Sequence, residues 1–309
     1  MVAAYKAPPH KRAVIIGNTG QLGLSLKFSK SLYSICRYFN FFITSHIDPH
    51  ENFRAVKSYL TAYKPDLVIN TIAYTSVDVA EEDKLISYHI NSVFPKILAE
   101  WCLKNDATLV HFSTDYVFDG RSNKPYKEED SPNPINQYGY DKLTAELYIE
   151  QMTNNFYIFR TSALYSPFRV NFLKKIFHKL SHPKAKGGYS FNVVNDQITI
   201  PTSCDFLLEH MYKIISTKAN GIYHVVPSNY CSWYEFARLI RSEAIRKGFL
   251  SSSAPMISPV KSTRFKSAAK RPLFSVLDNS KMAKALGIEI PSWDEIFREN
   301  CNEIFPLIL

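Results

Sequence analysis

The sequence lacks closely spaced cysteine and histidine ligands. Its five cysteines are odd in number, scattered and never in a CxxC pair: Cys36, Cys102, Cys204, Cys231 and Cys301. Disulfide frameworks and structural zinc sites need paired or regularly spaced ligands. We therefore expect reduced thiols, a cytoplasmic location and no metal site.

Long apolar runs are also missing. No stretch reaches the ~18–20 apolar residues of a membrane span, and residues 1–12 contain no apolar core of a secretory signal. We expect no membrane partner and interpret residues 1–10 as a flexible tail. Because the chain has neither internal repeats nor a low-complexity linker, its lobes are expected to be interleaved.

Nucleic-acid-binding motifs are absent as well, although the formal net charge is +9. Without such a motif, this charge favours a basic enzyme that binds an anionic cofactor or substrate, and no nucleic-acid partner is expected. The chain has 309 residues, of which 46% are hydrophobic and 14% aromatic. That is enough to form a large core.

A glycine-rich segment follows the first apolar strand, residues 13–16. Its spacing is GxxGxxG, and its residues are Gly17, Asn18, Thr19, Gly20, Gln21, Leu22 and Gly23. At a strand-to-helix junction such glycines allow a tight turn and close approach to a pyrophosphate. We predict a dinucleotide loop for NADPH or NADH. Residues 45–48, where Asp48 is either a ribose ligand or a helix cap, leave the preference open with a lean to NADPH.

Strands and helices are predicted to alternate. Further strands are expected at residues 41–45, 65–70 and 109–112, with helices between them, which favours a doubly wound parallel sheet (Rossmann α/β fold). We assign residues 11–160 and about 194–226 to this dinucleotide-binding domain. Residues about 161–193 and 227–309 are assigned to a smaller, interleaved substrate-binding lobe.

Tyr138 and Lys142 are four residues apart at the start of a predicted helix, so their side chains share one face. A nearby ammonium favours phenolate, and we expect Lys142 to lower the pKa of Tyr138 so that it acts as a general acid. Thr114, at the end of the strand before it, can hydrogen-bond the same substrate oxygen. His111 and His224 lie in apolar runs and are interpreted as core histidines.

Several motifs in this order resemble an extended short-chain dehydrogenase/reductase, and closely the dTDP-4-dehydrorhamnose reductase family. They are GxxGxxG, PDLVIN followed by AYTSVDVAE, STDYVFDG, YGYDK and RPxxSVLDNSK, and the similarity runs from about Val14 to Trp293. It implies NAD(P)H-dependent reduction of the C4 ketone of a dTDP-4-keto-6-deoxy-L-hexulose to dTDP-L-rhamnose or a related sugar nucleotide.

The resemblance also implies roles for individual residues. Thr114, Tyr138 and Lys142 match the catalytic triad, and the glycine segment with Ala73, Tyr74 and Thr75 matches cofactor contacts. The implied sugar contacts are Val77, Asp115, Tyr116 and position 163. The basic segment 261–271 is interpreted as solvated surface, with diphosphate binding by one or two of its members as the alternative.

Two positions depart from the family pattern. Ala163 stands where the family usually has a Trp, which leaves open a different 4-keto sugar nucleotide as substrate. Ser25 replaces an acidic residue that helps some relatives bind magnesium between subunits, so we expect no such magnesium-bridged dimer, although a homodimer remains open. A non-catalytic alternative is a cofactor-binding regulatory subunit, like the beta subunit of methionine adenosyltransferase.

Overall fold

A computed structural model describes residues 10–29, 32, 36–42, 49–182 and 190–309. Its main sheet is built from six parallel strands in the order β10-β5-β4-β3-β1-β2. These strands are β1 (His10–Ile16), β2 (Cys36–Phe42), β3 (Leu67–Asn70), β4 (Thr108–Thr114), β5 (Phe156–Thr161) and β10 (Gly221–His224). The predicted doubly wound α/β fold is confirmed.

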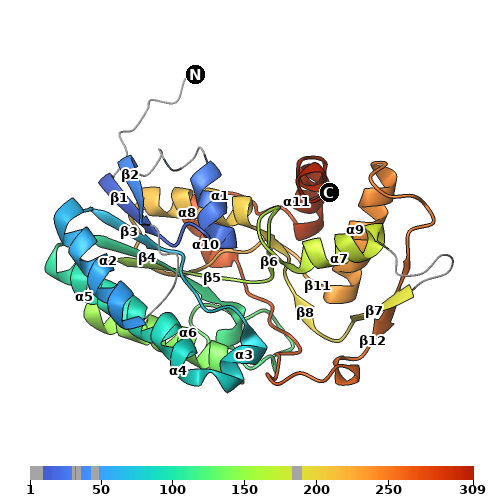
Figure 1. Cartoon of the computed structure of the whole chain (residues 1–309), viewed down its shortest axis with the longest axis horizontal. Coiled ribbons are helices and arrows are strands. Elements are labelled where there is room, and N and C mark those ends of the chain that lie inside the picture. Colours follow the sequence, from blue (N-terminus) through green and yellow to red (C-terminus); the bar gives the residue numbers. More distant parts are fainter. Residues whose placement is uncertain (1–9, 30–31, 33–35, 43–48, 183–189) are drawn as a thin grey trace.

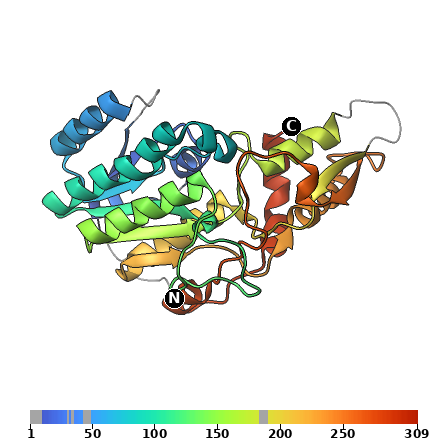
Figure 2. The ribbon, with the colours of Figure 1, turned by 90° about the horizontal axis from the view of Figure 1, so that it is seen from below.

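Helices cover both faces of this sheet (Figures 1 and 2). One face packs against α2 (Pro49–Tyr63), α5 (Phe94–Lys104) and α6 (Gln137–Met152), and the other against α1 (Gln21–Phe28), α8 (Cys204–Thr217) and α10 (Ser280–Leu286). The strands are apolar on both sides because both sides are buried; all four residues of β3 are buried.

The smaller lobe lies beside the carboxyl ends of the main strands (Figure 1). It contains β6 (Leu164–Tyr165), α7 (Phe172–Ser181), β7 (Ser190–Val194), β8 (Ile198–Thr199), β9 (Thr202–Ser203), β11 (Cys231–Ser232), α9 (Trp233–Arg246), β12 (Met256–Val260) and α11 (Trp293–Ile304). These elements share a second core, and three two-stranded sheets, β11-β8, β12-β7 and β6-β9, tie distant segments together.

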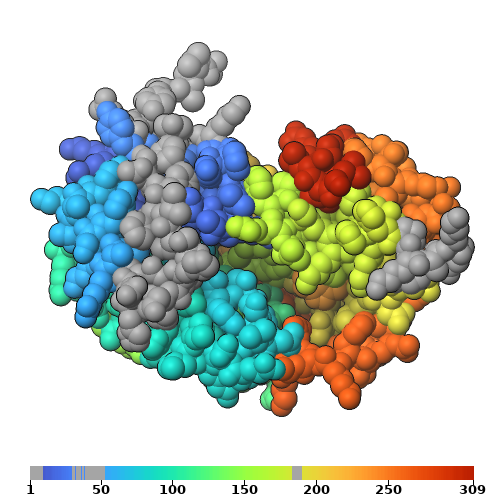
Figure 3. All heavy atoms as spheres, in the orientation of Figure 1, coloured from blue at the N-terminus to red at the C-terminus, as the bar shows by residue number. Residues whose placement is uncertain are grey.

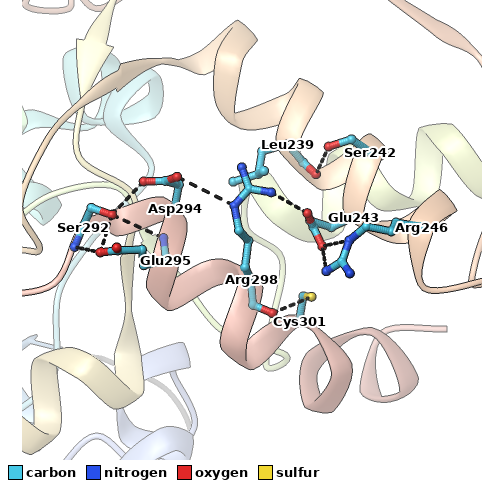
Figure 4. Close-up of polar contacts among 9 residues, drawn as sticks. All are labelled: Leu239, Ser242, Glu243, Arg246, Ser292, Asp294, Glu295, Arg298 and Cys301. Atoms are coloured by element: carbon cyan, nitrogen blue, oxygen red, sulfur yellow. Dashed lines mark hydrogen bonds and ion pairs between the residues drawn. The ribbon is translucent and has the colours of Figure 1, made fainter.

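A buried carboxylate joins α9 to α11 in this lobe. Glu243, whose side chain is 2% exposed, accepts from Arg298 Nη1 at 2.6 Å and from Arg246 Nε at 2.9 Å (Figure 4). α11 itself begins with a capping box between Ser292 and Glu295 (Figure 4). The orientation of the last long helix is therefore fixed by charge as well as by apolar packing.

The sequence-based boundaries need several adjustments. The second strand occupies residues 36–42 rather than 41–45, and residues 43–48, including Asp48, lie outside the described part of the chain, as do residues 1–9 of the expected tail. The helix expected at residues 89–102 is preceded by α3 (Val77–Glu82) and α4 (Lys84–Tyr88) and starts with a π-helical turn, His89–Val93. The α10 segment packs against α8 and β10 of the large domain instead of the smaller lobe.

Among the residues that the structure describes, no helix combines the length and the apolar character that crossing a bilayer requires.

Candidate functional site at the carboxyl edge of the sheet

The parallel strands bring the predicted motifs to one edge of the sheet. β1 ends at Ile16 before the glycine loop (residues 17–23), β3 ends at Asn70, and β4 ends at Thr114. Ile16 pairs with Asn70, and Asn70 with His111, so the three segments leave the sheet side by side. In open α/β sheets this edge is where ligands bind.

The glycine loop has the backbone geometry that a dinucleotide requires. Gly17 has φ +92°, and a Cβ on Gly23 would lie only 1.8 Å from the Gly17 carbonyl oxygen, so α1 packs directly on the turn. A Cβ on Gly20 would meet nothing within 4 Å, which leaves its backbone open to a ligand. Asn18 Oδ1 is buried and has no hydrogen-bond partner among the described residues. The loop therefore fits a pyrophosphate at the start of α1.

The segment after β3 borders this loop. Thr71 Oγ1 donates to the carbonyl oxygens of Ile16 (2.9 Å) and Gly17, which holds the two segments together. The Tyr74 N–H donates to Asn91 Oδ1 at 2.9 Å, and Asn91 Nδ2 donates back to the Tyr74 carbonyl oxygen at 3.0 Å. Ala73 and Tyr74 are half-buried and Thr75 is exposed, so part of this segment faces outward beside the loop.

The smaller lobe reaches the same loop through Arg169. Its Nε donates to the Thr19 carbonyl oxygen at 2.5 Å, and its φ of +56° is unusual for a residue with a Cβ. On the opposite side of the loop, Gln21 Nε2 lies 3.4 Å from Cys204 Sγ of α8. The loop is thus held from both lobes.

Thr114 and Asp115 form a buried hydrogen-bonded pair at the end of β4. The Thr114 hydroxyl donates to Asp115 Oδ1 at 3.0 Å, and the Ser162 hydroxyl donates to Asp115 Oδ2 at 2.9 Å. Burial raises the pKa of Asp115 to about 6, against the lowering effect of these hydroxyl donors. Asp115, interpreted from the sequence as a sugar contact, therefore already binds Thr114 and Ser162 within the protein.

Tyr138 lies next to Thr114 because α6 begins against the β4 loop. Asn136 caps the helix by accepting from the Gly139 N–H at 2.8 Å. A Cβ on Gly139 would lie 2.2 Å from the Tyr116 carbonyl oxygen, so glycine permits this close approach. The Tyr116 and Tyr138 rings meet edge to face at 6.1 Å. The Thr114 side chain hydrogen-bonds to the Tyr138 phenol, and this bond lowers the pKa of Tyr138.

The prediction that Lys142 lowers the pKa of Tyr138 is wrong. Burial, with the charge of Asp115, raises the pKa of Tyr138 to about 12, and only the bond to Thr114 lowers it. Lys142 Nζ instead lies 2.9 Å from His111 Nε2, and its side chain is 1% exposed. Lys142 lies on α6 one turn after Tyr138, but its hydrogen-bond partner is His111 of β4.

The implied sugar-binding residues border this centre. Val77 begins α3 and is half-buried, as is Tyr116, while Ala163 is half-buried with φ +43°. Asp78 binds Arg271 through both carboxylate oxygens, at 2.6 Å and 3.2 Å, which holds its pKa well below the usual range. Within the basic segment 261–271, Arg271 therefore forms an ion pair with Asp78. The other basic side chains of the segment are exposed: Lys261, Arg264, Lys266 and Lys270.

The smaller lobe contains a cavity of about 630 Å³ between α7, β7 and the segment after β12. Aromatic and cationic side chains line it, among them Phe172, Trp233, Phe265, Lys174 and Lys175. The space-filling view shows a hollow between the teal part around α3 and the yellow-green part around α7, whereas the residues that line this cavity include none from α3 (Figure 3).

No metal-binding cluster is found within the described ranges: histidine, cysteine and carboxylate side chains nowhere gather in threes there. Ser25 stands at the position where the sequence led us to expect no magnesium ligand. Its hydroxyl donates to the Gln21 carbonyl oxygen at 3.1 Å.

Sequence reasoning missed the partners of Lys142. His111 and Asn70 are each 1% exposed, and they hydrogen-bond to each other at 3.2 Å. The available signal was a polar side chain at the end of β3 and a histidine on β4. Their contact depends on strand register, which the sequence does not display.

Comparison with known proteins places this site in a family. The family described as "RmlD substrate binding domain" matches residues 11–305. A dTDP-4-dehydrorhamnose reductase of Aggregatibacter actinomycetemcomitans is 33% identical over 293 residues, 93% of this chain and 97% of that protein. The Escherichia coli K12 enzyme of the same name is 29% identical over 297 residues, 94% and 97% of the two chains.

A solved structure agrees with these relatives. The dTDP-4-dehydrorhamnose reductase of Bacillus anthracis in complex with NADP superposes with a TM-score of 0.84 at 32% identity, covering 95% of this chain and 99% of that one. The family motifs identified in the sequence converge on the sheet edge described above. The chain therefore belongs to the dTDP-4-dehydrorhamnose reductase family.

Proposed function

We infer that the chain is an NAD(P)H-dependent sugar-nucleotide ketoreductase. Its substrate is a dTDP-4-keto-6-deoxy-L-hexulose, and its product is dTDP-L-rhamnose or a related deoxysugar nucleotide. The observation that carries this proposal is the contact between Thr114 and Tyr138 at the edge of the sheet where the glycine loop lies. Relatives of this chain are named dTDP-4-dehydrorhamnose reductase. A relative was solved with NADP, which supports a nicotinamide cofactor here.

Gly17 to Gly23, Ala73, Tyr74 and Thr75 would hold the cofactor. Backbone amides at the start of α1 face its pyrophosphate, and the segment after β3 borders its ribose. When bound, the nicotinamide supplies a hydride from C4 to the carbonyl carbon of the sugar. The protein has to place that carbonyl and neutralise the oxygen that becomes negatively charged.

Tyr138 donates the proton that the reduced oxygen takes up. Because burial keeps its pKa at about 12, the phenol is protonated at neutral pH and available as a donor. The Thr114 hydroxyl, turned from Asp115 Oδ1, donates a second hydrogen bond to the same oxygen and orients it. As the proton leaves, Tyr138 becomes a half-buried phenolate, which an ammonium on Lys142, one helical turn away, would stabilise.

The nucleotide occupies the cavity between α7 and β7. Phe172, Trp233 and Phe265 offer faces on which a base can stack, and Lys174 and Lys175 offer positive charge to a diphosphate. Val77, Tyr116 and Ala163 border the sugar. A small residue at Ala163 leaves space there, which favours testing other 4-keto sugar nucleotides as an alternative substrate class.

The test is oxidation of NADPH and NADH, followed by nicotinamide absorbance, with a panel of keto-sugar nucleotides. The proposal expects turnover with dTDP-4-keto-6-deoxy-L-hexulose. Faster turnover with a different 4-keto sugar would reassign the substrate. Cofactor binding without turnover on any member would overturn catalysis and favour a regulatory subunit instead.

A further inference from the structure

A chain of three buried side chains runs from β3 through β4 to α6. Asn70 Nδ2 lies 3.2 Å from His111 Nδ1, and His111 Nε2 lies 2.9 Å from Lys142 Nζ. Each of the three residues is 1% exposed. We call them the Asn70–His111–Lys142 chain. Each hydrogen bond in it needs one donor and one acceptor from these side chains.

The orientation of the Asn70 amide sets the direction of this chain. The Ile72 N–H donates to Asn70 Oδ1 at 3.1 Å, so the oxygen faces the backbone and the NH₂ group faces His111. An amide NH₂ group only donates, so His111 Nδ1 has to accept. The neutral imidazole then carries its hydrogen on Nε2, and this N–H points at Lys142.

Lys142 has to accept that hydrogen bond. An ammonium has three donors and no lone pair, whereas a neutral amine has one lone pair. The contact at 2.9 Å is therefore compatible with an uncharged Lys142 and not with a charged one. An uncharged Lys142 cannot stabilise a phenolate on Tyr138, so this arrangement differs from the one that catalysis requires.

We propose that Asn70 and His111 are positioning residues whose hydrogen bonds hold Lys142 as a neutral amine, and that dinucleotide binding converts it to the ammonium. This inference rests on the proposed function, because it explains how the Tyr138 site becomes active. The ribose hydroxyls would accept hydrogen bonds from the ammonium, and the phosphates of the dinucleotide favour its charge.

The surroundings of Lys142 are consistent with a change of charge. Burial lowers its pKa to about 7 and lowers the pKa of His111 well below the ordinary value. The carboxylates of Glu146 and Asp141 raise the pKa of Lys142, but Glu146 is paired with Arg160 at 2.6 Å.

The remaining charges around α6 also have partners. Asp141 accepts from the Ser87 hydroxyl at 2.5 Å and from Gln137 Nε2 at 2.8 Å. Glu81, from α3, accepts from the Gln137 N–H, and Asp115, after β4, accepts from Thr114. Each of these carboxylates already has a hydrogen-bond donor, so an anionic ligand would add charge that favours the ammonium.

The proposal predicts proton uptake on cofactor binding. At pH 8, above the pKa of about 7, the free protein should take up close to one proton per bound dinucleotide. Below about pH 6, where Lys142 is already charged, the uptake should fall towards zero. Cofactor affinity should weaken as the pH rises above 7, by about tenfold per pH unit.

Titration calorimetry with NADH in two buffers of different ionisation enthalpy measures this uptake directly. It needs no keto sugar, and NADH avoids titration of a 2′-phosphate. Zero uptake by the native protein at pH 8 would overturn the proposal. A protein that takes up the proton but reduces no ketose would overturn only the proposed function.

The Asn70→Asp variant tests the direction of the chain. A carboxylate accepts but does not donate, so His111 would carry its hydrogen on Nδ1 and accept from an ammonium through Nε2. We expect uptake at pH 8 to fall to less than about a fifth of a proton, and the pH dependence of affinity to flatten. Uptake equal to that of the native protein would exclude this role for Asn70.

The matched control is His210→Gln. His210 is another buried histidine, 4% exposed, which contacts the Phe206 carbonyl oxygen within α8 at 2.8 Å. We expect native proton uptake in this variant. The native titration from pH 6 to pH 9 decides the proposal even where a variant fails to fold.

Discussion

At the scale of single residues, burial sets the chemistry of the site. It keeps Tyr138 protonated, shifts Lys142 towards its neutral form, and raises the pKa of Asp115 to about 6. The sequence showed Tyr138 and Lys142 on one helical face, and that spacing suggested direct coupling. The sequence could not show that His111 of β4 hydrogen-bonds to Lys142.

Asp115 should reveal itself in the pH dependence of stability. Its pKa is raised above the model-peptide value of 3.8, so the folded state binds more protons than the unfolded state between about pH 4 and pH 6. Its contribution to the free energy of unfolding therefore decreases as the pH rises through that window, by ~1–3 kcal/mol.

Urea unfolding of the native protein and of Asp115→Asn at pH 4.5 and pH 7 measures this effect. We expect the stability of the native protein relative to the variant to fall between the two pH values. Asp106→Asn, at an exposed position, serves as the control. A difference between native protein and Asp115→Asn that is the same at both pH values would count against a buried carboxylate of this kind.

At the scale of elements, α6 positions the catalytic groups through its first turn. The Asn136 cap and Gly139 set how closely α6 approaches Tyr116, and Tyr138 lies between them. The helix and the YGYDK spacing were predictable from the sequence. The reason for the glycine was not, since it depends on the Tyr116 carbonyl oxygen from another segment.

Gly139→Ala should impair catalysis through position. The added Cβ would lie 2.2 Å from the Tyr116 carbonyl oxygen, so α6 has to shift away from β4 and carry Tyr138 from Thr114. We expect kcat to fall by about 10²-fold and the free energy of unfolding by ~1–3 kcal/mol.

Steady-state kinetics and chemical denaturation measure the two effects. Thr144→Ala, at a half-buried position of α6 whose hydroxyl donates to the Tyr140 carbonyl oxygen within the same helix, should leave kcat unchanged. Native kcat in Gly139→Ala would show that the approach of α6 to Tyr116 does not matter to the reaction.

At the scale of the whole molecule, the two lobes are built from interleaved segments. The alternating pattern of strands and helices predicted the main sheet because fully buried parallel strands are short, apolar and evenly spaced. It did not place α10, whose Met282 belongs to the core of the large domain although Leu277 before it and Trp293 after it belong to the core of the smaller lobe. Such crossings depend on long-range packing and leave no local signal.

The smaller lobe should depend on Glu243. In Glu243→Gln one oxygen of the buried carboxylate becomes an NH₂ group that faces a guanidinium, so that guanidinium loses its acceptor and the buried NH₂ group gains none from it (Figure 4). We expect the free energy of unfolding to decrease by ~1–3 kcal/mol.

Chemical denaturation would measure that decrease, with Glu299→Gln, an exposed position on α11, as the matched control. If Glu243→Gln proves as stable as this control, the ion pairs between α9 and α11 contribute little to the lobe.

The proton donated by Tyr138 is the central claim, and Tyr138→Phe tests it most directly. The variant keeps the ring that packs against Tyr116 and removes only the hydroxyl. The measurement is kcat for ketone reduction, alongside the dissociation constants of cofactor and substrate, with Tyr140→Phe as the control, since Tyr140 is 53% exposed on the same helix. The account expects kcat to fall by about 10²–10⁴-fold with binding nearly unchanged, whereas native turnover by Tyr138→Phe would contradict it.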